Sequence, residues 1–296
     1  MASKSTEKLT INVQKAIASI PSSEGVYRML KKDPRGFCFI VSIEEFDTSV
    51  EGDKVAEDRN GAEVDRKNLE ELFKQLGFAV EVLLNGTKDQ IKEKIDWIRK
   101  ERKCKNGDMF VAIVLSHGKE GYFVTRDNQN YDIEDFITDF NNEGWQPFIG
   151  KPKLIIINAC RGKGEGGRPV VDTGVHKIEY NPIEGAAKTD DHPGAGAVRA
   201  KRVSTEDMMV AYAANPGYAA CRDEIRGSWY IQSLCDVFMN QAHNHELTEL
   251  LSNVSKKLST FTDAEGKRQC CEFNNRNFYK KLYFNPGSPK PATFTR

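Results

Sequence analysis

The chain has 296 residues, 39% hydrophobic and 29% charged, which is typical of one large folded domain or two smaller ones. Its 43 basic and 43 acidic side chains cancel to a formal net charge of +0, which argues against general nucleic-acid binding, because that binding needs a basic excess or face. No apolar stretch approaches the roughly 18 residues of a membrane span, and residues 1–5 carry no secretory signal, so we expect a cytoplasmic protein without membrane or nucleic-acid partners.

Apolar runs alternate with amphipathic stretches along most of the chain. The runs are strand-sized and typical of strands buried on both faces, whereas the stretches have apolar residues at helical spacing. In chain order we predict a strand at 37–43, a helix at 65–76, a strand at 78–84, a helix at 87–100, strands at 109–115 and 154–159 flanking a helix at 133–140, a strand at 208–213, helices at 229–241 and 246–261, and a strand at 278–284. This alternation predicts an α/β fold with a mostly parallel central sheet of about six strands and helices on both faces.

Three segments lack this alternation. Residues 1–25 are expected to form a loose N-terminal arm, in which residues 11–20 could form a marginal helix. Residues 161–205 hold glycine and proline clusters and few large apolar side chains, so we expect a functional or disordered loop there. The tail at 286–296 is expected to be disordered.

The seven cysteines are an odd number, and none has the CxxC spacing of metal ligands. A disulfide framework and a structural zinc site are therefore not expected. In a reducing compartment a single thiol can serve chemistry while the other cysteines act as small apolar groups of the core.

A histidine and a cysteine follow two of the predicted strands. His117 comes just after Leu115, and Cys160 comes directly after the strand at 154–159. Ligands bind at the carboxyl edge of parallel sheets, so we expect the imidazole and the thiol to meet there as a base and a nucleophile. Gly118 permits close backbone approach, and its N–H together with that of Cys160 is predicted to hold an oxyanion.

These residues belong to two short motifs, Ser-His-Gly at 116–118 and Asn-Ala-Cys-Arg-Gly at 158–162. The pair closely resembles the caspase family of cysteine peptidases, whose usual pentapeptide is Gln-Ala-Cys-[RQG]-Gly with a histidine upstream. Further segments resemble that family in the same order over residues 26–285, namely 34–38, 59–61, 150–153, 216–218 and 227–232. The resemblance implies a caspase-haemoglobinase-like sandwich and hydrolysis of proteins after aspartate, with no metal or organic cofactor.

The resemblance also assigns a pocket for the substrate aspartate at P1. Arg59 and Arg222 match the family's pocket arginines, and arginine suits a buried carboxylate because it forms charge-assisted, bidentate hydrogen bonds. Asn158 stands where the family has a glutamine one methylene longer, which puts catalytic strength and stringency at P1 in question. Trp229 matches the tryptophan that forms the wall of the family's substrate groove. In the implied mechanism Cys160 attacks the carbonyl carbon, and the family's histidine protonates the leaving amine.

Family zymogens are cut between a large and a small subunit, which implies processing in the long loop. Asp172 is the first candidate cleavage site, and Asp190 or Asp191 is the second. The expected organisation begins with a short arm or prodomain at residues 1–25 and a large subunit at 26–172. An excised linker at 173–191, a small subunit at 192–285 and a tail at 286–296 follow. The strand at 278–284 resembles the family's dimer strand, so we expect a homodimer, because pairing removes an apolar sheet edge.

The sequence alone permits three functional hypotheses. The first is an active aspartate-directed endopeptidase acting in apoptosis, with upstream caspases and inhibitor-of-apoptosis proteins as candidate partners. The second, motivated by Asn158, is a non-catalytic homologue that regulates another caspase by heterodimerisation, and the third is a protease with a different P1 preference. The arm is too short for a death-fold adaptor domain, which favours an effector-like, short-prodomain type, whereas residues 27–38 and 59–61 also resemble initiator types.

Overall fold

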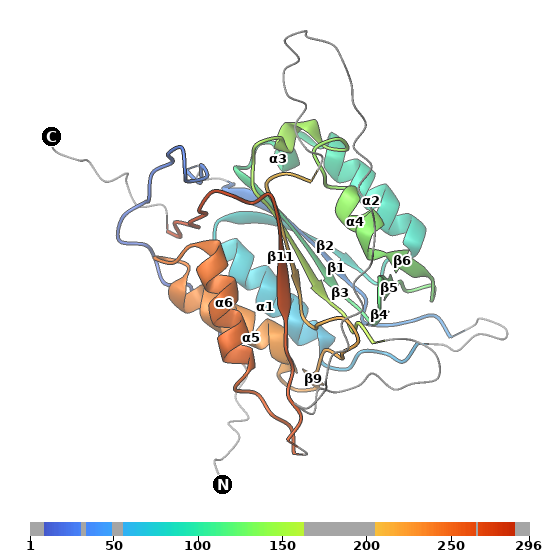
Figure 1. Cartoon of the computed structure of the whole chain (residues 1–296). Helices are drawn as coiled ribbons and strands as arrows, with labels where there is room; N and C mark the ends of the chain where they lie inside the picture. Colours follow the sequence, from blue (N-terminus) through green and yellow to red (C-terminus); the bar gives the residue numbers. More distant parts are fainter. Residues whose placement is uncertain (1–8, 31–33, 49–55, 163–204, 265, 288–296) are drawn as a thin grey trace, which may run out of the picture.

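The computed structural model describes residues 9–30, 34–48, 56–162, 205–264 and 266–287, and these residues are arranged around a six-stranded sheet (Figure 1). The strand order is β11-β8-β7-β3-β1-β2. These strands are β1 (Gly36–Ser42), β2 (Phe78–Leu84), β3 (Met109–Leu115), β7 (Lys153–Asn158), β8 (Met208–Tyr212) and β11 (Glu272–Arg276). All neighbours are parallel except β11, which runs antiparallel to β8, so the prediction of a mostly parallel sheet is confirmed.

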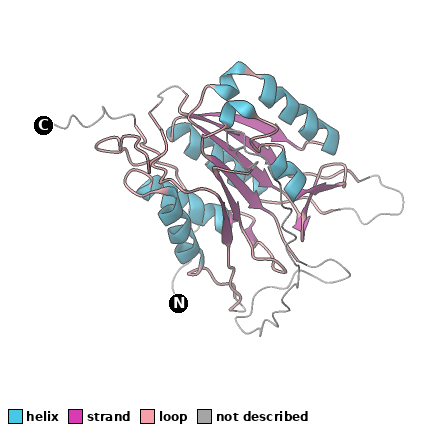
Figure 2. Cartoon of the chain, turned by 45° about the horizontal axis from the view of Figure 1, so that its top comes forward, coloured by secondary structure: helices cyan, strands magenta, loops and turns pink. Residues whose placement is uncertain are grey.

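Helices cover both faces of the sheet, as predicted (Figure 2). The helices on one face are α1 (Ala62–Gln75), α5 (Trp229–Gln241) and α6 (Leu247–Leu258), and those on the other side are α2 (Lys88–Lys100), α3 (Arg102–Lys105) and α4 (Ile133–Thr138). A short 3-10 helix at Gln146–Phe148 leads towards β7. Among the described residues, no helix combines the length and the apolar character that a membrane crossing requires.

The central strands are buried on both faces, which explains their continuous apolar runs. In β1, Phe37, Phe39 and Val41 pack with α2 and α4, whereas Cys38 and Ile40 pack with α1, α5 and α6. Successive side chains of a strand point to opposite faces, so a strand between two helix layers needs apolar residues at every position. The sheet is therefore the middle layer of a three-layer sandwich.

Two small sheets lie outside the central one. The first consists of β4 (Gly118–Lys119), β5 (Tyr122–Val124) and β6 (Asn130–Asp132) and follows directly after β3. The second is a hairpin of β9 (Arg222–Asp223) and β10 (Gly227–Ser228), which leads straight into α5. Both carry residues that the sequence analysis assigns to the site.

The predicted final strand at 278–284 is wrong. The strand that pairs with β8 is β11, whereas residues 278–284 run irregularly, with an isolated bridge from Lys281 to Val26. Phe278, Leu282 and Phe284 are buried in the core beside α5 and α6. The aromatic content of this segment reflects burial rather than sheet pairing, and polar β11 occupies the sheet edge.

The N-terminal arm contains no helix at residues 11–20, so the marginal helix predicted there is also wrong. Ile11 and Val13 are buried, and both join their backbone to Gln75 of α1. The Gln75 amide donates to the Ile11 carbonyl oxygen at 3.0 Å, and the Val13 N–H donates to Gln75 Oε1 at 2.8 Å. The Gln14 N–H donates to the Met239 carbonyl of α5 at 2.8 Å. Residues 11–14 are therefore packed against the domain.

The arm also contacts the C-terminal segment of the described chain. The Ala16 N–H donates to the Pro286 carbonyl at 3.0 Å, and Asn285 exchanges two hydrogen bonds with the backbone of Ile20, at 2.9 and 3.1 Å. Residues 288–296 of the predicted disordered tail lie outside the described residues, as do residues 1–8.

Replacing Ile11 by alanine is expected to lower the free energy of unfolding by about 2 kcal/mol, because the truncation leaves a gap in the contact between the arm and the core. Ile17, in the same arm, is 97% exposed, so Ile17→Ala serves as the matched control and is expected to have little effect. Urea denaturation followed by tryptophan fluorescence measures both. Equal midpoints for the two variants would show that the arm contributes nothing to stability.

Candidate active site

The register between β3 and β7 brings His117 and Cys160 to the same edge of the sheet. Leu115 pairs with Asn158 in this parallel register, and the histidine and the cysteine each lie two residues further along. Both side chains are partly exposed, at the carboxyl ends of buried strands. The sheet topology thus places a thiol and an imidazole on one rim, where α/β proteins bind ligands.

Hydrogen bonds to a second segment hold the loop that carries Cys160. The Arg161 N–H donates to the Tyr218 carbonyl at 2.8 Å, and the Gly217 N–H donates to the Arg161 carbonyl at 2.7 Å. The Arg161 guanidinium lies 4.1 Å from the centre of the Tyr212 ring and pairs with Glu272 of β11 at 2.5 Å. The backbone after β8 and the edge strand therefore both help to position the thiol.

A backbone carbonyl orients the His117 ring. Nε2 lies 2.7 Å from the carbonyl oxygen of Glu57, which can only accept, so Nε2 carries the proton and Nδ1 is the acceptor. The ring stacks on Phe46, with centroids 5.2 Å apart. Burial lowers the pKa of His117, and the positive charges of Arg59 and Arg222 lower it further, against the opposing effect of the Glu57 hydrogen bond. The imidazole is thus a neutral base at neutral pH.

Gly118 lies in close contact with the cysteine loop. A Cβ atom at this position would be 2.7 Å from the Tyr122 carbonyl oxygen and 2.8 Å from both the Cys160 carbonyl oxygen and the Ala159 Cβ. No side chain fits there without moving backbone, so glycine is needed to bring the strand after His117 against the loop after β7.

Replacing Gly118 by alanine is expected to lower kcat on the order of 10²-fold, because the clash displaces the two backbone segments that carry the reacting groups. Gly25 is the matched control, since a Cβ atom there meets nothing within 4 Å and Gly25→Ala should leave kcat unchanged. Steady-state kinetics on a peptide substrate measures both variants. Unchanged kcat in Gly118→Ala would show that this close approach has no part in the chemistry.

Two arginines from distant parts of the chain lie near Cys160. Arg59 is only 3% exposed, and its Nη1 donates to the Ile43 carbonyl at 2.9 Å, while Nε has no partner among the described residues. Arg222 of β9 is half-buried, and its Nε donates to the Asn60 carbonyl at 2.8 Å. Burial lowers the pKa of Arg59 to about 10, and repulsion by Arg222 adds to the effect.

Neither guanidinium forms an ion pair with a carboxylate within the described part of the chain. The charge of nearby Asp65 offsets part of the repulsion between the two arginines without pairing with either, so both keep donors for a further anion. The arrangement suits a carboxylate beside the thiol.

Asn158 is buried at the end of β7, 2% exposed. Its Nδ2 donates to Ser228 Oγ at 3.1 Å, while Oδ1 is buried without a partner among the described residues. The Ser228 hydroxyl and N–H donate to the two oxygens of Asp65 at 2.5 and 2.7 Å. Burial raises the pKa of Asp65 to about 6, against the opposing effects of Ser228, Arg59 and Arg222.

Trp229 begins α5 and is 9% exposed. Its ring packs on Phe261 with centroids 5.7 Å apart, and its backbone N–H donates to the Cys221 carbonyl at 3.0 Å. It therefore lies against the strand segment that leads to Arg222.

Three groups of this site are absent from the residues predicted from the sequence. Glu57 contributes only its backbone, which leaves no trace in residue type. Asp65 precedes Leu69 by four residues on the apolar face of α1, and an acidic residue in that position was a usable signal. Ser228 is an ordinary residue before a helix, so only its contacts reveal it.

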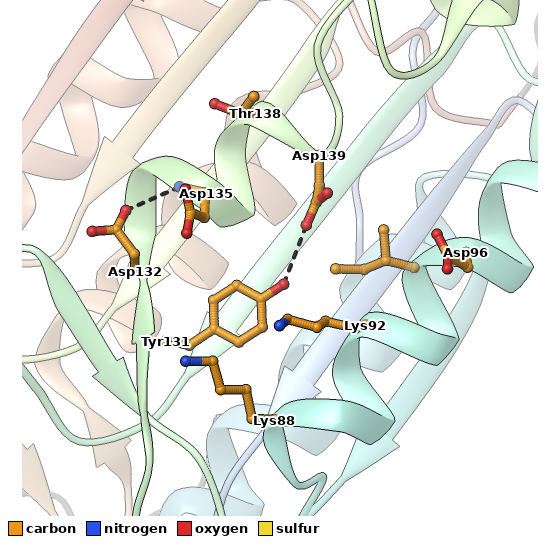
Figure 3. Close-up of a pocket in the computed structure, with 9 residues that line it drawn as sticks. Lys88, Lys92, Asp96, Tyr131, Asp132, Asp135, Thr138 and Asp139 are labelled. Carbon is orange, nitrogen blue, oxygen red and sulfur yellow. Dashed lines mark hydrogen bonds between the residues drawn. The ribbon is translucent and has the colours of Figure 1, made fainter.

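A separate pocket of about 430 Å³ lies between α2 and the β6–α4 segment (Figure 3). Lysines and aspartates line it together, and the Tyr131 hydroxyl inside it donates to Asp139 at 3.2 Å. None of the residues that the sequence analysis assigns to the site lines this pocket.

A parallel α/β sheet with a thiol, an imidazole and paired arginines at its carboxyl edge has the architecture of a caspase-like protein. Residues 35–283 match the family model of the caspase domain. The chain therefore belongs to the caspase family, as its motifs predict.

Curated relatives carry matching names. Cell death protein 3 of Caenorhabditis remanei is 32% identical over 270 residues, which cover 86% of this chain and 51% of that protein. Caspase Dronc of Drosophila melanogaster is 29% identical over 268 residues, covering 89% of this chain and 58% of that protein. Caspase-3 of Mus musculus is 31% identical over 255 residues, which cover 86% of this chain and 83% of that protein. The chain thus spans just over half the length of the first two relatives.

A solved structure supports the fold. The crystal structure of caspase-1 from Spodoptera frugiperda matches this chain with a TM-score of 0.72 at 24% identity. The match covers 94% of this chain and 100% of that one.

Proposed function

We propose that this chain is a cysteine endopeptidase that cleaves proteins after aspartate and acts in apoptosis. The observation that carries the proposal is the pair of arginines beside Cys160, one of them almost fully buried. A buried cationic pair with unused donors favours a substrate carboxylate, and the adjacent thiol and imidazole supply a nucleophile and a base. The names of the relatives support the role in cell death.

In the proposed reaction, His117 Nδ1 accepts the proton of the Cys160 thiol. The thiolate sulfur bonds to the main-chain carbonyl carbon of the P1 aspartate, and the N–H groups of Gly118 and Cys160 stabilise the oxyanion. The C–N bond then breaks as the imidazolium returns its proton to the leaving amine, which leaves a thioester. His117 next takes a proton from water, whose oxygen displaces the thiolate and releases the new carboxyl terminus.

The proposal is tested with fluorogenic peptides that differ only at P1, with Asp, Glu, Asn or Arg. We expect the Asp peptide to be turned over in preference to the other three. The paired arginines favour a carboxylate over the neutral Asn side chain and repel arginine, and the limited depth of the pocket favours Asp over Glu. Turnover of another peptide in preference would support the altered-P1 hypothesis. Absence of any turnover, even after cleavage of the loop, would favour a regulatory homologue, which should then change the activity of a partner caspase with or without Cys160.

We further propose that the protein is a cytoplasmic zymogen, activated by cleavage between residues 26–172 and 192–285. The candidate sites Asp172, Asp190 and Asp191 lie outside the described residues, so the support is their position in the long loop of the sequence. Replacing all three by alanine should block maturation, seen as an uncleaved chain on a denaturing gel. Normal processing of that triple variant would refute the assignment. Upstream caspases and inhibitor-of-apoptosis proteins are the proposed partners.

The proposed homodimer forms through β11 rather than through residues 278–284. In the described chain β11 is the last strand of the sheet on its side, with one edge paired to β8. Its open edge is suited to pairing with a second copy about a twofold axis. Sedimentation velocity of the purified protein distinguishes monomer from dimer.

A further inference from the structure

A series of hydrogen bonds connects α1 to the end of β7, close enough to the two arginines for their charges to act on Asp65. Asp65 accepts from the Ser228 hydroxyl at 2.5 Å and from the Ser228 N–H at 2.7 Å. Ser228 Oγ in turn accepts from Asn158 Nδ2 at 3.1 Å. Asp65 is 0% exposed, and Ser228 and Asn158 are each 2% exposed, so water does not compete for these bonds.

The direction of this series follows from counting protons. The pKa of Asp65 is raised to about 6, so at neutral pH the carboxylate is ionised and can only accept. The single proton of the Ser228 hydroxyl therefore goes to Asp65, and the serine oxygen is left as an acceptor. Only the NH₂ end of the Asn158 amide can face an acceptor. The charge on Asp65 thus decides how the amide of Asn158 is turned.

The backbone at Gly227 packs closely against this series of hydrogen bonds. Gly227 has φ +86°, and a Cβ atom there would be 2.2 Å from Asp65 Oδ1. The β9–β10 hairpin, which also carries Arg222, is thereby pressed onto the carboxylate. The negative charge of Asp65 also favours the charged forms of both Arg59 and Arg222.

Discrimination at P1 needs more than the arginines. Coulomb attraction to two guanidiniums changes little when a carboxylate moves by one methylene, so charge alone treats aspartate and glutamate alike. One Nδ2 proton of Asn158 goes to Ser228, so the second Nδ2 proton is the one that a P1 carboxylate can accept. Held in one place at the end of β7, this donor distinguishes aspartate from glutamate, because hydrogen-bond geometry and available depth depend on side-chain length.

We propose that Asp65 is a positioning residue of the aspartate pocket, which acts through Ser228 to hold Asn158 in one orientation and so sets the preference for aspartate over glutamate at P1. This inference rests on the proposed function. It predicts an effect on KM and on the Asp-to-Glu ratio, with kcat for the Asp peptide retained, because Cys160 and His117 are not touched.

The first test removes the Ser228 hydroxyl, which links Asp65 to Asn158. In Ser228→Ala, the ratio of kcat/KM for Asp and Glu peptides is expected to fall about three- to tenfold, the effect of one lost hydrogen bond. Ser228→Thr keeps the hydroxyl and should restore the ratio. Ser233→Ala is the matched control, because Ser233 is equally buried in α5 but its hydroxyl donates to the Trp229 carbonyl at 2.8 Å. An unchanged ratio in Ser228→Ala would overturn the inference.

The second test asks whether Asp65 acts through Ser228. Asp65→Asn should lower the ratio to a similar extent. An amide at position 65 can donate to Ser228, and the serine hydroxyl is then free to donate to Asn158 instead of accepting from it. In the double variant the two effects should not add. Additive effects, or an Asp65→Asn variant that loses only thermal stability, would mean that Asp65 supports the fold or the arginines directly.

A binding measurement separates this inference from the proposed function. In the Cys160→Ala background, fluorescence anisotropy of labelled Asp and Glu peptides reports the pocket without turnover. If the Asp peptide binds selectively and Ser228→Ala does not change that selectivity, the inference is refuted while the proposed function stands. If neither peptide binds and the wild type hydrolyses neither, both the inference and the proposed function are refuted.

Discussion

Replacing Cys160 by alanine is expected to abolish hydrolysis of the Asp peptide, with kcat/KM reduced by at least about 10³-fold. Without the sulfur no thioester can form, and the remaining groups only hold the substrate and the oxyanion. The fold should survive, because the side chain lies at the rim of the sheet rather than in its core. Initial rates with the fluorogenic Asp peptide measure the loss, and circular dichroism checks the fold.

Cys270 provides the matched control for this variant. It is an exposed cysteine outside the site, so Cys270→Ala should keep wild-type kcat/KM. If Cys160→Ala retained activity while Cys270→Ala lost it, the nucleophile would have been misassigned. Equal activity in all three proteins would point to a contaminating peptidase.

Replacing Arg59 by glutamine is expected to lower kcat/KM for the Asp peptide on the order of 10²-fold, mainly through KM. Each charge-assisted hydrogen bond to a carboxylate contributes about 1.5–3 kcal/mol, and a buried site magnifies the loss because water does not replace the donor. The same change also relieves the repulsion that Arg222 exerts on Arg59. The variant should therefore lose substrate affinity without a comparable loss of stability.

Arg99 is the control for removing an arginine. It pairs with Asp139 at 3.0 Å, and neither residue belongs to the site, so Arg99→Gln should leave KM unchanged. Steady-state kinetics on the Asp and Asn peptides, with thermal denaturation alongside, measures both variants. If Arg59→Gln accepted the Asp peptide as well as the wild type does, the carboxylate would bind elsewhere.

Most of the fold could be predicted from local sequence patterns. Strands such as β1 and β3 are buried on both faces, and a continuous apolar run is the direct consequence of that burial. Parallel strands end at a common edge, so the positions of His117 and Cys160 just after two such runs sufficed to place them on one rim. Family motifs supplied the two arginines, which no local pattern singles out.

The remaining features depend on contacts between distant segments. The aromatic residues at 278–284 are compatible with a strand and equally with a buried irregular segment. Their packing beside α5 and α6 selects the irregular segment. The course of residues 11–20 depends on partners in α1, α5 and the C-terminal segment.

The site shows the same division. The chemical groups available follow from residue types alone: a thiol, an imidazole, two guanidiniums and the short amide of Asn158. Their orientations follow from the fold, in which a backbone carbonyl turns His117, and Asp65 and Ser228 turn Asn158. A residue's type records its chemistry, whereas its orientation and charge state depend on hydrogen bonds and burial that involve residues far away along the sequence.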